Sequence, residues 1–414
     1  FCSIRYCTRS VMAMWAMWDT ALIFFVGFVV LFIWRQTCWW HCFGQYNRRF
    51  NYITLGFCLI AFVLIYDSAY FWIDFFSDAN AQSWNSTPVW LRVIVYISTI
   101  AIWPIFFAVS WQVFQHLTHI KDNEAIIQHD RAVQVIILPL VYATMCMSCL
   151  TKCYSFLVTD NNILVNSLAG WAVAKAETCL WIADLYEAWA LYQFGLLTIE
   201  QLKFYFGKQA KSQDPEVKAS GTALLKAHPA ISRLSQLGII SFVLVSVADC
   251  AVAVYVIVVG SNMPNFVSIF NSSQSAFNLA GFLASCIAIY NVYVVETEFH
   301  HDLEEFCPFL KFLTVKILVT FAYGQQYFFV ALQAMYNMFP SWQTAISEIP
   351  VLGALAKFNQ AEFYAFYSAL LIIECLLIAL MHLVAWNSEE SWYDEEPPET
   401  NSKADYGTMP EKNV

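Results

Sequence analysis

Long apolar stretches alternate with short polar ones along most of the chain. Each stretch exceeds the about 20 residues that a helix needs to cross the hydrocarbon core of a bilayer. Backbone groups inside lipid must be hydrogen-bonded within a helix or a closed barrel, and these stretches are too long and too uniformly apolar for barrel strands. The pattern therefore predicts an all-α, polytopic transmembrane helical bundle of about nine spans. The predicted spans are residues 11–34, 52–76, 91–117, 133–157, 168–197, 237–259, 274–297, 311–338 and 362–386.

Positive charge gathers in the loops on one side of this predicted bundle. An excess of Lys and Arg marks cytoplasmic loops, and with nine spans the basic segments 35–51 and 198–236 share a side. This places the N-terminus outside and the C-terminus in the cytoplasm, whereas opposite loops such as 339–361 carry almost no positive charge. We expect 207–230 to be a mobile cytoplasmic linker, and the acidic tail 387–414 to be disordered. The basic residues of the longer loop are Lys203, Lys208, Lys211, Lys218, Lys226 and Arg233.

Composition narrows the class of protein. Hydrophobic residues make up 59% of the 414 residues and charged residues only 13%, against about 25% charged in an ordinary soluble domain. The net charge of −10 argues against a nucleic-acid partner, which requires clustered positive charge. No nucleophile elbow, glycine-rich phosphate loop or zinc-protease motif is present, so the sequence indicates neither an enzyme nor a cofactor. Cys146, Cys149 and Cys153 recur on one helical face, but zinc needs about four N or S ligands, so we expect a packed helix contact and no metal site.

Carboxylic acids stand near the middle of three predicted spans. They are Asp184, Asp249 and Glu374, and Glu187 follows Asp184 by three residues on the same helical face. A charge at the centre of a bilayer costs at least about 2.5–3.5 kcal/mol. Such acids therefore either line a solute pathway or act as hydrogen-bonding clamps between helices, and both interpretations stay open. Two amides near the middle of the eighth span, Gln325 and Gln326, belong to the same predicted polar layer.

Two lysines also lie within the predicted spans. Lys316 is close enough to the cytoplasmic end, and Lys175 to the outer end, for each side chain to reach the interface. Either lysine attracts an anionic solute or lipid headgroup, with Lys316 biasing a pathway towards anions, or it snorkels or pairs with an acid such as Glu177.

Some residues are candidates for covalent modification. Asn85 and Asn271 begin glycosylation sequons in predicted outer loops, although Pro88 disfavours use of the first. Cys38 and Cys42 follow the first span closely and are palmitoylation candidates, with an ordinary interfacial belt as the alternative.

Four regions of the sequence carry a resemblance to a known family. They are SWQVFQHLTHI at 110–120 followed by RAVQVIILPLVYATMCMSCL at 131–150, ADLYEAWALYQF at 183–194, PFLKFLTVKILVTFAYGQQ at 308–326 and IIECLLIALMH at 372–382. In order and spacing they resemble the organic solute transporter alpha and transmembrane protein 184 family over roughly three quarters of the chain. The resemblance implies a seven-helix core with the C-terminus inside.

The resemblance also divides the chain. Residues 1–89 would add two N-terminal transmembrane helices, residues 90–386 would form the seven-helix core, and 387–414 the acidic cytoplasmic tail. The cysteines of the fourth span are spaced, whereas the bile-acid-transporting branch of the family has a long run of adjacent cysteines. The resemblance is therefore nearer to the transmembrane protein 184 branch, which leaves the substrate open. The transporting branch works with a single-span beta subunit.

Together these features predict a facilitative membrane transporter of an amphipathic organic solute or lipid-like molecule. The alternative is a non-transporting scaffold or accessory subunit of a larger membrane complex; a seven-helix signalling receptor ranks last because no receptor switch motif is present. Expected partners are membrane lipids, a single-span accessory subunit or larger complex, and a second copy of the chain, in the plasma membrane or an endomembrane. The candidate pathway residues are Asp184, Glu187, Asp249, Lys316, Gln325, Gln326 and Glu374.

Overall fold

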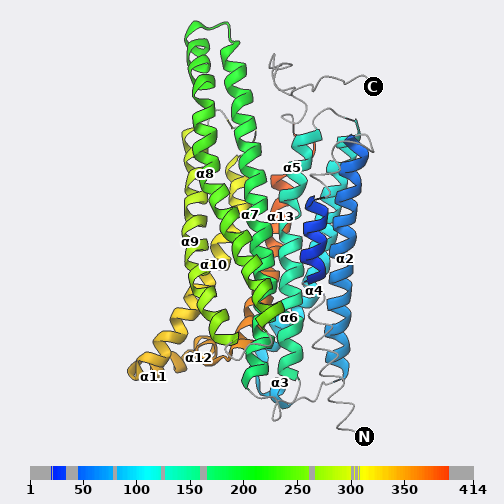
Figure 1. Cartoon of the computed structure of the whole chain (residues 1–414), viewed down its shortest axis with the longest axis vertical. Coiled ribbons are helices and arrows are strands. Elements are labelled where there is room, and N and C mark those ends of the chain that lie inside the picture. The colour runs from blue at the N-terminus through cyan, green and yellow to red at the C-terminus, as the bar shows by residue number, and fades with distance from the viewer. Residues whose placement is uncertain are drawn as a thin grey trace.

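The computed structural model describes residues 20, 22–33, 45–77, 82–122, 126–158, 166–260, 266–299, 303, 306 and 308–390. This part of the chain is helical and contains no strand. The long helices lie side by side along the long axis of the molecule (Figure 1). In chain order the helices are Leu22–Ile33, α2 (Gln45–Ser77), α3 (Gln82–Ser86), α4 (Val89–Asp122), α5 (Ile126–Ile136), α6 (Leu138–Val158), α7 (Asn166–Ala210), α8 (Pro215–Gly260), α9 (Phe266–Glu298), α10 (Pro308–Met338), α11 (Pro340–Glu348), α12 (Pro350–Lys357) and α13 (Gln360–Ala385).

A helix covers the described part of each predicted span, which for the first span is Leu22–Ile33. Within the residues that the structure describes, five segments are long and apolar enough to cross a membrane, so the all-α bundle is confirmed while the number of about nine spans stays a prediction. Helix α7 falls outside this set because its buried acids and tyrosines lower its mean hydropathy. The five segments are Tyr52–Phe76, Val89–His119, Ile127–Val158, Pro215–Tyr255 and Gln360–Ala385.

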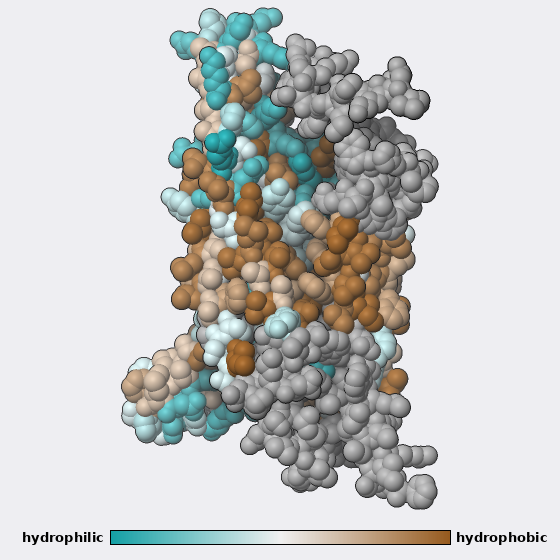
Figure 2. All heavy atoms as spheres, viewed as in Figure 1, coloured by the Kyte–Doolittle hydropathy of each residue, from teal (hydrophilic) through white to brown (hydrophobic). Residues whose placement is uncertain are grey.

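Apolar side chains cover the outside of the bundle as well as its core. On α4 the exposed large hydrophobic residues recur at three- and four-residue intervals and form one stripe. A band of apolar residues crosses the middle of the visible face, whereas hydrophilic residues gather over the α7–α8 end (Figure 2). This is the surface expected of helices that face lipid on one side and protein on the other. The exposed residues of the α4 stripe are Val93, Ile97, Ile100, Phe107, Trp111 and Phe114.

Helix α6 lies at the centre of the bundle. The apolar window of Ile127–Val158 is buried inside the protein along its whole length, and α6 packs against α2, α4, α7 and α13. The predicted span 133–157 is divided at Ile137, where α5 ends and α6 begins. Pro139 explains the division, because it has no backbone N–H and its ring crowds the carbonyl four residues earlier. The neighbouring amides of Leu140 and Val141 both bond to the carbonyl of Ile137.

The longest helices, α7 and α8, form a hairpin that projects beyond the rest of the bundle (Figure 1). With 45 residues, α7 is about 68 Å long, more than twice the about 30 Å of a hydrocarbon core. The prediction of a mobile linker at 207–230 is wrong, because α7 continues to Ala210 and α8 starts at Pro215. A tight turn joins them, and the basic side chains of this segment are exposed on the two helices. Apolar contacts around Leu202 and Phe206 hold the hairpin against the end of α9.

At the opposite end, two short helices replace the predicted loop 339–361. Helices α11 and α12 each start with a proline, whose fixed φ suits the first helical position. Helix α13 then begins with a capping box: the side chain of Asn359 accepts a bond from the amide of Glu362, and the Glu362 carboxylate accepts one from the amide of Asn359, both at 2.9 Å. The cap fixes where α13 starts and hence the register of Glu374 along it.

The tip of the α7–α8 hairpin depends on a close approach that only glycine permits. A Cβ atom at Gly221 would lie 2.5 Å from the backbone nitrogen of Ala210 and 2.7 Å from the backbone carbon of Gln209. Because backbone atoms cannot move aside, we expect Gly221→Ala to destabilise the tip by about 1–3 kcal/mol. Trypsin should then cleave faster at Lys208, Lys211 and Lys218. The matched control is Gly56→Ala, where a Cβ meets nothing within 4 Å; equal cleavage rates in both variants would contradict the prediction.

Candidate functional site

Two acids of α7, Asp184 and Glu187, lie against the central helix α6. The hydroxyl of Tyr142 on α6 donates a hydrogen bond of 2.8 Å to the carboxylate of half-buried Asp184. Glu187 lies one turn further along α7 and is 0% exposed, and neither of its carboxylate oxygens has a hydrogen-bond partner. A buried polar group normally finds a partner because leaving it unpaired costs about 1–3 kcal/mol. Glu187 is one of several buried side chains in the described part of the chain, His382 and Ser368 among them, that have polar atoms without a partner.

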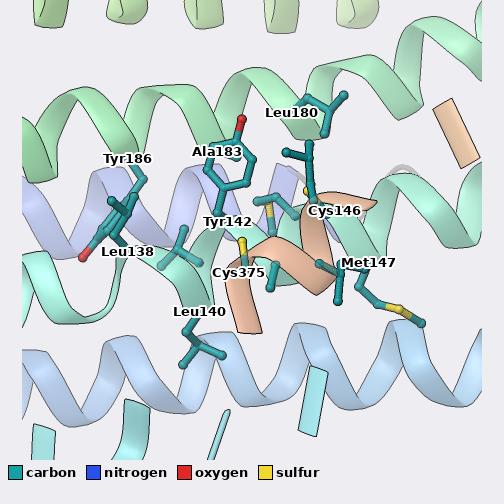
Figure 3. Close-up of a cluster of buried hydrophobic side chains, with 14 of the residues drawn as sticks. Leu138, Leu140, Tyr142, Cys146, Met147, Leu180, Ala183, Tyr186 and Cys375 are labelled. Carbon is teal, nitrogen blue, oxygen red and sulfur yellow. The ribbon is translucent and has the colours of Figure 1, made fainter. Parts of the chain in front are cut away.

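A third acid, Glu374 on α13, joins this pair. The amide of Gln325 on α10 donates a hydrogen bond to one Glu374 oxygen, and the other oxygen has no partner. Tyr367, two turns before Glu374 on α13, lies within electrostatic range of Asp184, Glu187 and Glu374. Cys375 lies within range of Glu187 and Glu374. Figure 3 shows Cys375 of α13 beside α6, with the Tyr142 ring extending from α6 towards Ala183 on α7. We call Asp184, Glu187 and Glu374 the acid cluster.

Asp249 on α8 lies at the edge of the acid cluster. It is half-buried and within electrostatic range of Asp184 and of Glu177, which is two turns before Asp184 on α7. Glu177 itself lies close to the buried Tyr364 on α13. The structure therefore gathers acids from three helices around α7, as a shared polar layer would require, although their role stays a prediction.

The other predicted pathway residues contribute less. Gln326 is half-buried next to Gln325, and it is not bonded to any acid among the described side chains. Lys316 lies on α10, but its side chain is outside the described residues. Lys175 is buried at 5% exposure. In the described part of the chain, no group of three His, Cys, Asp or Glu side chains is placed to hold a metal ion.

The modification candidates are only partly described. Asn85 lies in α3 and is exposed, and its side-chain oxygen accepts a 3.2 Å bond from Arg92. The sequon's Thr87 is buried and donates to the carbonyl of Trp84 at 2.7 Å. Asn271 lies near the start of α9, with its side chain outside the described residues, as are Cys38 and Cys42 altogether. Both glycosylation and palmitoylation stay predictions.

Sequence reasoning missed how α2 is fastened to the central helix. Ser148 on α6 donates a hydrogen bond to Asp67 on α2, and Ser155 donates one to Asp74. Asp67 and Asp74 are seven residues apart on α2, and Ser148 and Ser155 are seven residues apart on α6. The two hydrogen bonds therefore lie two turns apart, on facing sides of the two helices. Ring packing between Phe71 and Tyr154, at 4.4 Å between centroids, fills the space between them. The shared spacing is a signal that could have predicted the contact.

A buried lysine, also missed, lies beside these pairs. Lys152 is 4% exposed, and its ammonium group donates to the sulfur of Cys179 on α7 at 2.8 Å. Asp67 is within electrostatic range of Lys152 and provides the opposite charge. A buried cation with a nearby carboxylate is compensated within the protein, so this group is a link between α2, α6 and α7.

The hairpin end of the bundle holds a second polar network. The Gln112 amide on α4 donates to the carbonyls of His382 and Trp386 at the end of α13, at 2.5 and 2.8 Å. His116 bridges the same Trp386 carbonyl and His129 on α5, at 3.2 and 3.0 Å. These bonds satisfy carbonyls that the end of a helix leaves without intrahelical partners.

The buried Lys311 lies beside this network, against the ring of Trp386. Its ammonium group lies 2.5 Å from the Glu390 carboxylate and 2.6 Å from the Phe306 carbonyl, and it stands over the Trp386 ring at 5.4 Å. The chain beyond α13 is therefore attached to α10 at least as far as Glu390.

An apolar cavity of about 90 Å³ shares helices α6 and α7 with the acid cluster, although none of the three acids is among its lining residues. It is enclosed by Leu22–Ile33, α2, α5, α6 and α7, and the few polar groups in its wall include Gln134. Gln134 is held in place because its side-chain oxygen accepts from Trp189 at 2.8 Å and its carbonyl from Tyr186 at 2.9 Å. Tyr186 lies between Asp184 and Glu187 in the sequence, so α7 contributes to both features. Other lining residues are Phe24, Phe28, Phe32, Tyr52 and Val141.

Comparison with known proteins identifies most of this bundle. The family described as organic solute transporter Ostalpha matches residues 93–391, which is well over half of the chain and includes every member of the acid cluster. No curated protein and no solved structure gives a significant match.

The bond between Tyr142 and Asp184 can be tested by a double-mutant cycle. We expect Tyr142→Phe and Asp184→Leu each to lower the free energy of unfolding by about 1–3 kcal/mol, because each leaves a buried partner unpaired. The double variant should lose about 1 kcal/mol less than the sum. The measurement is equilibrium unfolding in mixed detergent micelles, followed by tryptophan fluorescence. Tyr255→Phe, at an exposed position of α8, is the control; strictly additive losses would show that the two side chains do not interact.

Proposed function

The chain belongs to the organic solute transporter Ostalpha family, and we propose that it is a facilitative transporter of an amphipathic organic solute. Family membership carries this proposal, since this is a family of membrane transporters and not of enzymes. The apolar helices agree with an integral membrane protein. The facilitative mode is part of the proposal, and the lack of a glycine-rich phosphate loop for an ATP-driven step agrees with it.

The acid cluster is our candidate for the polar part of the pathway. Asp184, Asp249 and Glu374 are half-exposed on helices whose other exposed residues are mostly apolar. A charged side chain at the centre of a bilayer costs at least about 2.5–3.5 kcal/mol, so we expect these three acids to face a polar pathway rather than lipid. Solute or water moving past these residues would exchange hydrogen bonds with them.

The apolar cavity supports the amphipathic character of the solute. Its walls are formed by aromatic and aliphatic side chains such as Phe28, Phe32 and Val141. A ligand site typically combines a mainly apolar lining with a few polar groups that fix orientation. An apolar cavity and an acid cluster that share helices α6 and α7 match a solute with an apolar body and a polar head.

We further propose that the hairpin end faces the cytoplasm, in the plasma membrane or an endomembrane. The exposed lysines of the α7–α8 hairpin lie at this end, where positive charge favours the cytoplasmic side. The end of α13 lies at the same end, which would place the C-terminus inside (Figure 1). Membrane lipids are then obligatory neighbours, and a single-span subunit, a larger complex or a second copy of the chain are proposed partners.

The orientation can be tested with an epitope tag placed after Val414. We expect the tag to bind antibody only after the cells are permeabilised, because the C-terminus should be inside. Asn271→Gln should abolish the mobility shift caused by a glycan-removing enzyme, and Asn85→Gln should not, because Thr87 of that sequon is buried. Staining of intact cells would overturn the orientation.

Transport can be tested in proteoliposomes that contain the purified full chain. The probe is a fluorescent octyl glucoside, which has a neutral polar head and an apolar tail. We expect saturable uptake above that of protein-free liposomes, equal in both directions without an ion gradient. The double variant Asp184→Asn with Glu374→Gln should reduce this uptake to background while keeping the same thermal unfolding temperature.

The control is Glu216→Gln, which neutralises an exposed acid in the first turn of α8 and should leave uptake unchanged. Wild-type uptake that persists in the double variant would remove these acids from the pathway. If the folded wild-type chain takes up no probe, the non-transporting accessory subunit becomes the better assignment.

A further inference from the structure

We propose that α11 and α12 form an amphipathic foot that lies in the headgroup region of the bilayer, at the end of the bundle opposite the α7–α8 hairpin. The foot is defined as residues 339–357. Its partner is a phospholipid surface, into which it inserts apolar side chains at the boundary between headgroups and acyl chains. The lipid contact is independent of the transport proposal, and only the choice of leaflet, the one away from the cytoplasm, depends on the proposed orientation.

The foot lies at the depth where a headgroup region is expected. It projects sideways from the bundle and is reached by the chain at the end of α10 (Figure 1). Helix α10 starts beside the polar network of the hairpin end, where Lys311 pairs with Glu390. With 31 residues, α10 is about 46 Å long, close to the about 40–45 Å of a bilayer with its headgroups. The far end of α10 therefore reaches the opposite headgroup region.

Hydrogen bonds and close packing hold the foot in one position. The Gln333 side chain on α10 donates to the carbonyls of Leu355 and Phe358, both at 3.3 Å. Within the foot, α12 approaches α11 so closely that a Cβ atom at Gly353 would lie 2.8 Å from the Cα atom of Ser347. The two short helices are thus one compact unit fixed to α10.

Apolar and polar side chains separate on the surface of the foot. Phe339 and Trp342 are 49% and 54% exposed, and their rings are 6.4 Å apart between centroids. The helical period places them roughly opposite Thr344 and Glu348, which are also exposed. On the visible side of the foot, apolar residues face the apolar band of the bundle and hydrophilic residues face away from it (Figure 2). This is the arrangement of a helix that lies along a membrane surface.

The composition of the foot favours lipid over water on its apolar side. Ile349 and Val351, at the junction of the two helices, add two more exposed apolar side chains. Trp is enriched where headgroups meet acyl chains, because its ring is apolar and its N–H is polar. The foot carries one negative and one positive charge, on Glu348 and Lys357, so its net charge suits an uncharged phosphatidylcholine surface.

The lipid contact of the foot extends to the acid cluster through α13. The capping box of Asn359 and Glu362 starts α13 directly after the foot, and Glu374 lies on the same helix. A foot anchored in the headgroup region therefore fixes the depth of α13 in the bilayer, and with it the depth of Glu374.

Photo-cross-linking of the full chain in dioleoylphosphatidylcholine nanodiscs tests the foot. One variant carries a photoreactive side chain on the apolar side, Trp342→p-benzoylphenylalanine, and the matched control carries it on the polar side of α11, Thr344→p-benzoylphenylalanine. After illumination, mass spectrometry of the digested protein measures lipid adducts. We expect severalfold more lipid adduct at position 342 than at position 344, because only the first should reach the acyl chains.

The leaflet is tested separately on intact cells. Thr344→Cys is treated with a membrane-impermeant maleimide, and labelling of the unsubstituted chain is subtracted. We expect labelling without permeabilisation, because the polar side of the foot should face the outside. Labelling only after permeabilisation would reverse the orientation, whereas lipid adducts at position 342 would still support the lipid contact.

The remaining outcomes decide the lipid contact itself. Equal adducts at both positions, or no lipid adduct at position 342 in the folded chain, overturn it. Cross-links from position 342 to a second protein chain instead of lipid also overturn it and make the foot a protein interface. If the Trp342 variant does not fold, Phe339→p-benzoylphenylalanine decides by the same comparison. None of these measurements depends on uptake, so a failure of transport leaves the result intact.

Discussion

Helix α6 is buried along nearly its whole length, so its polar side chains find partners inside the protein: Thr144 bonds back to the Leu140 carbonyl of α6 itself, and several others bond to neighbouring helices. This constraint explains much of the bundle, because the partners of α6 fix where those neighbours lie. Ser148 and Ser155 hold α2 through two carboxylates, Tyr142 reaches α7, and Lys152 reaches Cys179. Apolar packing alone holds membrane helices together without a strong preference for register, because lipid is as apolar as the side chains. The polar bonds of α6 supply that register.

The acids on α2, α7 and α13 then divide into two kinds. Asp67 and Asp74 are fully explained as clamps, since each accepts a bond from a serine on α6. Asp184 is also a clamp through Tyr142, but the same side chain is half-exposed. Glu187 has no such explanation, because its burial is complete and its oxygens are unpaired. A stabilising role accounts for the first kind of acid, and the second kind is the one that the proposed pathway would use.

The positions of the helices could be predicted from the sequence because hydrophobicity over about 20 residues is a direct physical requirement of the bilayer. The polar layer could also be anticipated, since Glu374 and Gln325 stand at similar depth in their own spans and do bond to each other. The helical hairpin beyond Leu202 could not be predicted in this way, because outside the membrane a helix need not be hydrophobic. The polar composition of this segment is also typical of a linker. The unpaired state of Glu187 depends on tertiary packing, which no spacing in the sequence reveals.

The domain boundary predicted near residue 90 has a different physical meaning in the structure. The family match begins at residue 93, yet α2, which precedes it, supplies the carboxylates that pair with Ser148 and Ser155 of the central helix. Tyr52 of α2 also donates to Asp130 on α5, and α2 forms one wall of the apolar cavity. A helix that satisfies polar groups of the core inside a membrane cannot be removed without leaving those groups unpaired. The N-terminal helix is therefore part of the folding unit that positions the acid cluster, although the family pattern does not include it.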